Sequence, residues 1–182
     1  MEITSFITNV GLITSKGSFG DNVMACEWTH QVSESPTQIM ICIKPDGATY
    51  ANIQEHGQFG VNICSIDQNV IASIAGNNSG KDIDKVDFLK EFGVSFYKAK
   101  TIDVLMVTGS SLNAECVLTK LIEISDYSLF IGTVQFAGET RKEPLSYHMG
   151  KYFRLGKQIS KPDNTVLDRI ELLKVKYSRS IE

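Results

Sequence analysis

The sequence predicts a mainly β fold of the α+β class, an antiparallel sheet or barrel with short helical insertions and a C-terminal helix. Several strand-length apolar runs follow one another along the chain. Few of them are separated by helices long enough for parallel crossover connections. Helical periodicity is confined to short insertions and to the C-terminus. A chain of 182 residues fits one domain with a sizeable core.

The first third of the chain carries four predicted strands. They span residues 7–14, 22–30, 38–43 and 59–63. A glycine-containing turn at 15–20 joins the first two strands, and a small-polar loop at 31–36 precedes the third. Residues 39–43 form a nearly continuous apolar run, which predicts a strand covered on both faces.

Three short helices are predicted in the middle of the chain. They span 48–56, 67–76 and 84–92. Gly57, Gly76 and Gly93 mark their C-terminal ends, and Asp67 is the expected N-cap of the second helix. The segment 94–113 has no clear period and is interpreted as irregular.

The last third predicts two long strands and a helix. Residues 114–124 and 129–136 flank a turn at 125–128, so we expect an antiparallel hairpin. A short aromatic segment follows at 145–155. Apolar residues then recur every three or four positions from 165 to 177, which predicts an amphipathic helix. We therefore expect a barrel domain over residues 1–160 and a C-terminal helical extension over 161–182.

Composition excludes some function classes. The formal charge of −3 gives no basic face for nucleic acid. Neither a long apolar run nor a basic start is seen at the N-terminus, so we expect a cytoplasmic protein that does not enter membranes. The cysteines are Cys26, Cys42, Cys64 and Cys116. Each lies in an apolar run without a Cys-x-x-Cys or metal-ligand spacing, which favours reduced packing residues.

Residues 17–36 are the first candidate for a ligand site. A glycine turn leads into a strand-length run with the only tryptophan, Trp28, and a small-polar loop ends at Pro36. Small residues permit close approach to the backbone, and Asn22, Thr29 and Ser33 add polar groups. The chemistry of these residues does not name the ligand.

An ordered set of segments resembles the flavin reductase-like family of FMN-binding split barrels. Residues 22–29 read Asn-Val-Met-Ala-Cys-Glu-Trp-Thr and precede a Ser-x-x-Pro at 33–36. The other matching segments are 10–14, Thr49 with Ile53, 57–62, 84–88, 115–116, 132–134 and 144–152. The resemblance covers residues 10–155 and leaves the C-terminal helix outside it.

The resemblance implies an antiparallel split β-barrel, a homodimer and FMN near the subunit interface. The implied function is reduction of flavin, or of a metal or protein acceptor, by NAD(P)H through the bound FMN, with no membrane or nucleic-acid partner. Hydride chemistry belongs to the flavin, so no catalytic side chain is expected. NAD(P)H would bind transiently, because residues 17–20 lack a dinucleotide fingerprint and a following helix.

The candidate cofactor-binding residues follow from this resemblance and from their residue types. They are Asn22, Val23, Met24, Ala25, Cys26, Trp28, Thr29, Ser33, Thr49, Ser79, Lys85, Tyr127, His148 and Tyr152, with Lys81 as a further candidate. Most have a simpler alternative role: Asn22 as a turn residue, Trp28 as core or interface packing, Thr49 as a helix cap and Lys85 as solvated surface.

Two other functions remain open. Many relatives carry His where Tyr127 stands, which weakens the case for a pyridine-nucleotide donor. A flavoredoxin-like electron carrier, reduced by another protein, is therefore one alternative. The other is a non-redox binding module on the same barrel, because a fold does not determine a function. The histidines His30, His56 and His148 form no metal-ligand set.

Overall fold

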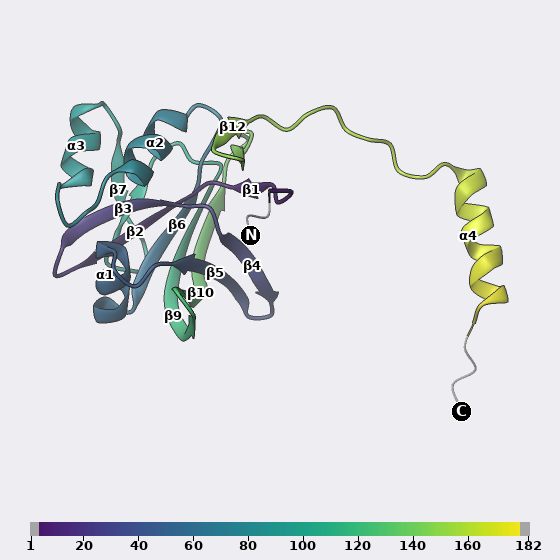
Figure 1. Ribbon diagram of the computed structural model, residues 1–182, viewed down its shortest axis with the longest axis horizontal. Coiled ribbons are helices and arrows are strands. Elements are labelled where there is room, and N and C mark those ends of the chain that lie inside the picture. Colours follow the sequence, from purple (N-terminus) through teal and green to yellow (C-terminus); the bar gives the residue numbers. More distant parts are fainter. Residues whose placement is uncertain (1–3, 179–182) are drawn as a thin grey trace.

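The computed structural model describes residues 4–178 and has a seven-stranded antiparallel sheet at its centre (Figure 1). The strand order is β3-β2-β6-β9-β10-β5-β4. These strands are β2 (Gly11–Gly17), β3 (Gly20–Cys26), β4 (Thr29–Glu34), β5 (Thr37–Ile43), β6 (Gln58–Ile63), β9 (Leu112–Ile124) and β10 (Tyr127–Glu139). The sheet confirms the mainly antiparallel prediction.

Strands β3 and β4 follow each other along the chain with only a bend between them, and they form the two opposite edges of the sheet. Strand β3 pairs with β2 and strand β4 pairs with β5, with the bend at Glu27 and Trp28. The prediction of one strand over 22–30 followed by a loop over 31–36 was therefore wrong. Two different partner strands impose the bend, and the exposed edge strand β4 lacks the apolar alternation by which a strand is recognised.

The antiparallel hairpin of β9 and β10 is confirmed. Tyr127 pairs with Ile124 across a turn at Ser125 and Asp126, and the two strands of 13 residues each are the longest elements of the sheet. Strand β5 pairs with the other side of β10. Only one face of β5 is buried: Ile39, Ile41 and Ile43 lie in the core, whereas the residues between them are half-buried. The expectation of a strand covered on both faces was wrong.

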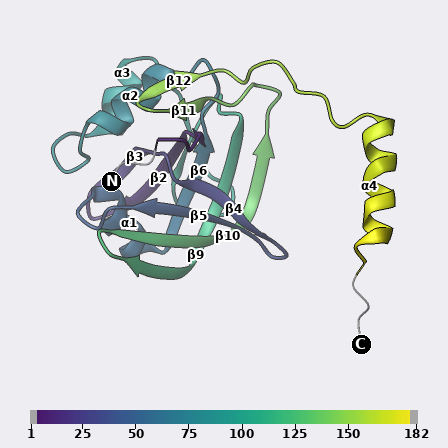
Figure 2. The same cartoon turned by 45° about the vertical axis from the view of Figure 1, so that its right-hand side comes forward.

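The core has two layers. The barrel interior contains Ile13, Ile41, Phe59 and Phe130, all inaccessible to solvent. The second layer lies between the outer face of β2 and β3 and the helices α2 (Asn69–Asn77) and α3 (Lys85–Glu91). The two helices therefore cover one side of the barrel next to β3 (Figure 2).

The short helices begin and end close to the predicted positions. Helix α1 (Ala48–His56) ends at Gly57, whose φ of 70° is the left-handed conformation that glycine adopts without strain. Asp84 caps α3 by accepting a hydrogen bond from the N–H of Asp87. Asp67 is not the cap of α2, since Gln68 holds that position and the Asp67 carboxylate binds Lys142 at 2.8 Å instead.

The segment 94–113, predicted to be irregular, contains β7 (Phe96–Lys98) and β8 (Leu105–Val107), a two-stranded antiparallel sheet. The buried carboxylate of Glu115 holds the loop between them. It accepts hydrogen bonds from the N–H of Lys100 at 2.8 Å and the N–H of Thr101 at 2.6 Å. Burial by itself would raise the pKa of Glu115. The hydrogen bonds together outweigh this effect, so the pKa of Glu115 is lowered overall.

The two ends of the domain meet in a small sheet. Strand β1 (Thr8–Asn9) pairs with β11 (Ser146–His148), which pairs with β12 (Lys151–Phe153). The predicted first strand is thus divided between β1 and β2. The four cysteines are free thiols, as expected. In the described part of the chain, no helix is long and apolar enough to cross a membrane.

The predicted C-terminal helix is α4 (Asn164–Lys176), and its N-cap is Asp163. An extended, exposed segment carries it away from the barrel, and none of its residues is buried (Figures 1 and 2). Residues 179–182 of the expected extension lie outside the described residues.

Candidate functional site

A groove runs along the free edge of β3, where this strand separates from β5. Its cavity measures about 320 Å³. In the described chain, β3 has a strand partner on one side only, so its outer N–H and C=O groups are available to a ligand. The lining residues come from both edges and from the start of α1: Met24, Ala25, Cys26, Glu27, Trp28, Cys42, Ile43, Lys44, Asp46, Gly47, Tyr50 and Tyr127.

Aromatic rings form the walls of this groove. Trp28 and Tyr127 pack with ring centres 4.8 Å apart and planes tilted by 55°. The Lys44 ammonium lies 5.6 Å from the centre of the Tyr127 ring, a cation–π contact. Tyr50 is fixed edge-on against Phe130 of the core, with ring centres 5.1 Å apart. Such surfaces suit a flat, conjugated ligand.

Polar groups gather at the end of the groove where β3 meets α1. Asn22 Nδ2 donates to Thr49 Oγ1 at 2.8 Å, and both side chains are buried. Asn22 Oδ1 has no hydrogen-bond partner among the described residues. Exchanging the amide O and N would let Thr49 donate to Oδ1 and leave Nδ2 as a free donor. Helix α1 has no side-chain cap at Gly47, so its first N–H groups also remain available for an anion.

A second cavity, of about 200 Å³, lies beside Asn22. Gly80 covers the Asn22 amide so closely that a Cβ at position 80 would lie 2.3 Å from Oδ1. The next residue, Lys81, also lines this cavity, and its ammonium lies 5.6 Å from the centre of the Phe19 ring. Lys81 is therefore the lysine that the structure brings to Asn22.

Lys85, the lysine expected at a phosphate, has a different environment. It is only 3% exposed, and its Nζ donates to the carbonyl of Ala75 at 3.2 Å, in the last turn of α2. Burial lowers the pKa of Lys85 to about 8. The Lys85 ammonium stabilises the C-terminal end of α2 through this carbonyl. Lys85 lines none of the cavities described here.

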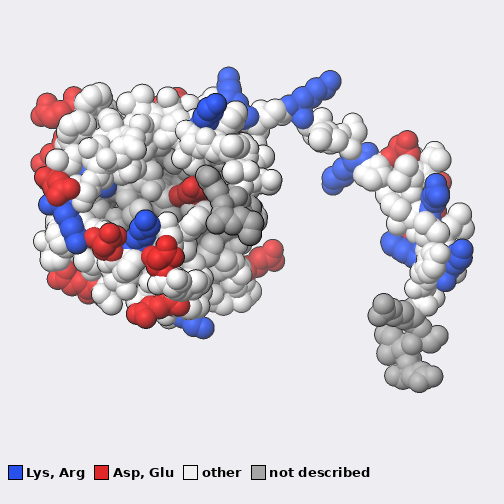
Figure 3. All heavy atoms as spheres, viewed as in Figure 1, with Lys and Arg blue, Asp and Glu red and all other residues white. Residues whose placement is uncertain are grey.

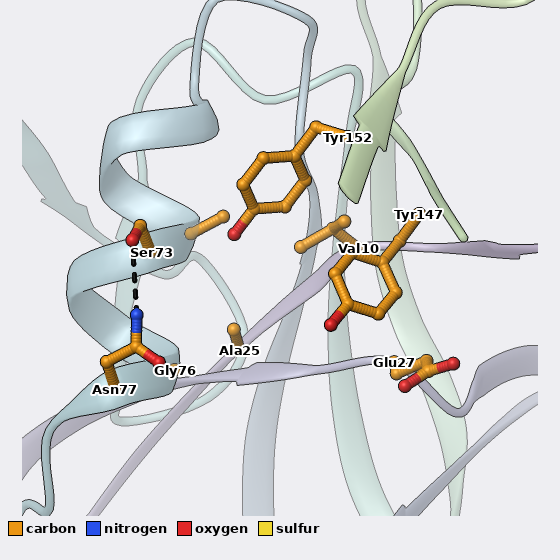
Figure 4. Close-up of a pocket in the computed structure, with 9 residues that line it drawn as sticks. Val10, Ala25, Glu27, Ser73, Gly76, Asn77, Tyr147 and Tyr152 are labelled. Atoms are coloured by element: carbon orange, nitrogen blue, oxygen red, sulfur yellow. Dashed lines mark hydrogen bonds between the residues drawn. The ribbon is translucent and has the colours of Figure 1, made fainter. Parts of the chain in front are cut away.

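A third cavity, of about 210 Å³, lies on the other side of β3, against α2. The rings of Tyr147 and Tyr152 project from β11 and β12 into this space, with centres 5.7 Å apart (Figure 4). Burial raises the pKa of Tyr152. Ala25 and Glu27 line both this cavity and the groove, so the two spaces adjoin along β3.

The predicted site residues are thus divided among several places. The groove includes Met24, Ala25, Cys26, Trp28 and Tyr127. Asn22 and Thr49 do not line it; they form a buried pair beyond Met24 and beside Tyr50, with Asn22 at the second cavity. The remaining candidates lie elsewhere: Val23 and Thr29 in the interior, Ser33 in β4, Ser79 in the loop before α3, Lys85 under α2, His148 against the Phe6 carbonyl and Tyr152 in the third cavity.

Sequence reasoning missed most of the other lining residues of these two cavities, among them Glu27, Cys42, Lys44, Tyr50 and Tyr147. Lys44 and Tyr50 flank the turn between β5 and α1, and their position next to an apolar strand and a helix start was an available signal. Glu27 and Tyr147 lie within the segments 22–29 and 144–152 that carry the family resemblance, which was the available signal. In residues 4–178, no group of three His, Cys, Asp or Glu side chains is arranged to hold a metal.

The structure is thus an antiparallel split barrel with an aromatic groove along a free strand edge. The model of the flavin reductase like domain family matches residues 3–156. The chain belongs to this family.

Known proteins of this kind are similar over most of the chain. The reductase subunit HsaB of a flavin-dependent monooxygenase from Rhodococcus jostii is 25% identical over 162 residues, 88% of this chain and 76% of HsaB. The NADH:FAD oxidoreductase SgcE6 of Streptomyces globisporus has a TM-score of 0.75 and 22% identity, covering 84% of this chain and 88% of its own.

The flavoredoxin of Methanosarcina acetivorans gives a TM-score of 0.79 with 20% identity, over 93% of this chain and 98% of its own. In contrast, the matched region spans only 63% and 62% of the length of two curated archaeal relatives, from Pyrococcus abyssi and Archaeoglobus fulgidus.

Proposed function

We propose that the protein binds FMN in the groove along β3 and uses it to pass electrons from NADH or NADPH to a flavin, metal or protein acceptor. The observation that carries this proposal is the groove itself, with an aromatic wall of Trp28 and Tyr127 at one end and buried polar groups at the other. The flavin supplies the redox chemistry when bound.

Different residues of the chain would bind different parts of FMN. The free edge of β3 offers N–H and C=O groups that match the polar edge of an isoalloxazine ring. Trp28 and Tyr127 cover its flat face and exclude water. Asn22, Thr49 and the first turn of α1 accommodate the phosphate, with Lys81 as its counter-charge. Lys85 supports the loop that carries Lys81 by fixing the end of α2.

Other features support a cytoplasmic homodimer. Four free thiols are typical of a reducing compartment. Exposed Trp28, Phe6 and Met149 form an apolar rim beside the groove, which a second copy would cover. A flavoredoxin-like carrier is the second candidate, since the resemblance places Tyr127 where many members of the family have His, and this exchange would alter the donor site.

Anaerobic stopped-flow measurement tests the donor. Mixing the FMN-loaded protein with NADH or NADPH should bleach the blue flavin absorption. Bleaching by a reduced ferredoxin but by neither nucleotide would establish the carrier instead. A protein that binds no FMN in a titration would contradict both functions.

A comparison of FMN with riboflavin, which lacks the phosphate, tests the polar end. Lys81→Ala should lower the affinity for FMN about tenfold and leave riboflavin binding unchanged. The Lys85→Ala variant is the matched comparison, because sequence reasoning assigned the phosphate to that lysine. If Lys85→Ala alone lowers FMN affinity selectively, Lys85 replaces Lys81 in this role.

A further inference from the structure

Helix α4 presents apolar side chains that nothing in residues 4–178 covers. Val166, Ile170 and Leu173 recur on one side at spacings of three and four, yet they are 46%, 39% and 42% exposed. An isolated helix of 13 residues is marginal in water even with a good N-cap. A covering surface is therefore needed to hold α4 in its helical form.

The segment that precedes α4 leads away from the barrel of its own chain. The Glu143 carboxylate accepts hydrogen bonds from Arg154 Nη2 and from the N–H of Leu155, both at 3.1 Å. From this clamp to Asp163 every residue is exposed, and the ribbon extends outward (Figure 1). Ten extended residues span roughly 33 Å, which is enough to reach a neighbouring molecule.

The barrel carries an apolar surface that is also uncovered. Phe6, Ile7 and Met149 are 72%, 71% and 64% exposed, and we call them the Phe6–Met149 surface. This surface borders a cavity of about 670 Å³ lined by Thr4, Phe6, Thr8, Glu27, Trp28, Tyr147, Met149 and Gly150. Two of these residues, Glu27 and Trp28, also line the groove.

The segment that carries α4 and the barrel differ in the sign of their net charge. Residues 157–176 carry five Lys or Arg and three Asp or Glu, a net charge of +2. The rest of the chain is therefore −5, since the total is −3. In Figure 3, basic side chains follow the tail, while acidic side chains predominate on the visible face of the barrel. Glu27 contributes a carboxylate to the lining of the cavity.

We propose that α4 of each molecule packs on the Phe6–Met149 surface of a second copy of this chain. Every copy has one apolar, basic helix directed outward and one apolar surface on an acidic barrel. A two-fold exchange therefore covers the side of each α4 that carries Val166, Ile170 and Leu173 and the Phe6–Met149 surface of each barrel. The helix of the partner then closes the cavity next to Glu27 and Trp28 and completes the groove. The exchange rests on the homodimer of the proposed function, but its test requires no flavin.

Photo-cross-linking of the full chain tests the contact. The variant Ile170→benzoylphenylalanine places the reactive group on the apolar side of α4, and Val175→benzoylphenylalanine, at a 78% exposed position on the opposite side, is the matched control. Irradiation should give a covalent dimer only for the Ile170 variant, with cross-linked peptides that contain Phe6 or Met149. A cross-link within one chain would show that α4 folds back, and it would overturn the proposal, as would no cross-link at all.

A second measurement tests the closure of the groove. The double variant Ile170→Glu, Leu173→Glu should abolish binding of α4 and weaken FMN affinity severalfold, whereas Leu172→Glu, Val175→Glu should not. The barrel core contains no residue of α4, so both variants should fold. Equal FMN affinity in the two variants would refute the closure. Absence of FMN binding in the unaltered protein would contradict only the proposed function, because the cross-link is decided without it.

Discussion

Trp28 and Tyr127 meet with ring centres 4.8 Å apart, although one follows the end of β3 and the other begins β10. Trp28 is the only tryptophan, so its fluorescence reports on this wall of the groove. Added FMN should quench that emission with the same midpoint as flavin binding. No quenching at saturating FMN would place the flavin elsewhere.

The contribution of Tyr127 can be measured by substitution. Tyr127→Ala removes the ring and should lower FMN affinity by about 0.5–1.5 kcal/mol, or roughly twofold to tenfold. Tyr127→Phe keeps the ring and should bind FMN like the unaltered protein. A titration in which both variants lose affinity equally would assign the effect to the hydroxyl rather than to the ring.

The buried pair of Asn22 and Thr49 should contribute to stability without any ligand. Thr49→Val removes the hydroxyl that accepts a hydrogen bond from Asn22 Nδ2, and it leaves that buried donor unpaired. We expect a loss of about 1–3 kcal/mol in the free energy of unfolding of the flavin-free protein, measured with urea. Thr49→Ser retains the hydroxyl and should lose much less. Equal stability of the Val variant and the unaltered protein would contradict this role.

Lys85 should make stability depend on pH in the alkaline range. Its pKa is about 8 in the folded state and near 10.5 when unfolded, so the unfolded chain binds more protons between these values. The free energy of unfolding therefore rises with pH in this window, by about 1 kcal/mol from pH 8 to pH 9. Below pH 8 the amine is charged in both states and the cost of burying it is fully present.

Denaturant titrations of Lys85→Met should lack this rise, because no proton is gained or lost at that position. The exposed Lys120 provides the control, since Lys120→Met should keep the pH dependence of the unaltered protein. If the free energy of unfolding depended on pH equally in all three proteins, the Lys85 amine would be solvated rather than buried.

Cys42 should be the thiol that reacts first in the native protein. It lines the groove and is partly exposed, whereas Cys26, Cys64 and Cys116 are buried. Burial raises the pKa of Cys64 and of Cys116 to about 12, which leaves them protonated and inert. A thiol reagent should modify one cysteine per chain, and bound FMN should slow the reaction.

Burial, and to a smaller degree nearby Asp126, also raise the pKa of Cys42, so its reaction should accelerate at alkaline pH. Cys42→Ser should remove the reactive thiol and leave three that appear only on unfolding. Modification of two or more cysteines in the folded protein would show that the core is open.

The sequence identified local features well and long-range ones poorly. Helices α1 and α3 were recognisable because Gly57 and Asp84 supply their end signals within the segment itself. The bend at Glu27 was not, because it results from pairing with β2 before it and β5 after it. Asn22 and Thr49 were candidates from their motifs, and the structure joins them in one buried hydrogen bond. The burial of Lys85 depends on how α2 packs against α3, which no local pattern records.

The free edge of β3 has a further consequence, for solubility. An unpaired strand edge can add a strand from another molecule, which is a common route to aggregation. Whatever lies along Met24 to Cys26 also blocks that route. Flavin-free protein should therefore scatter light sooner on warming than flavin-loaded protein, and equal onset would contradict this. Bound flavin would thus protect the protein from aggregation at this strand edge as well as serve as a redox group.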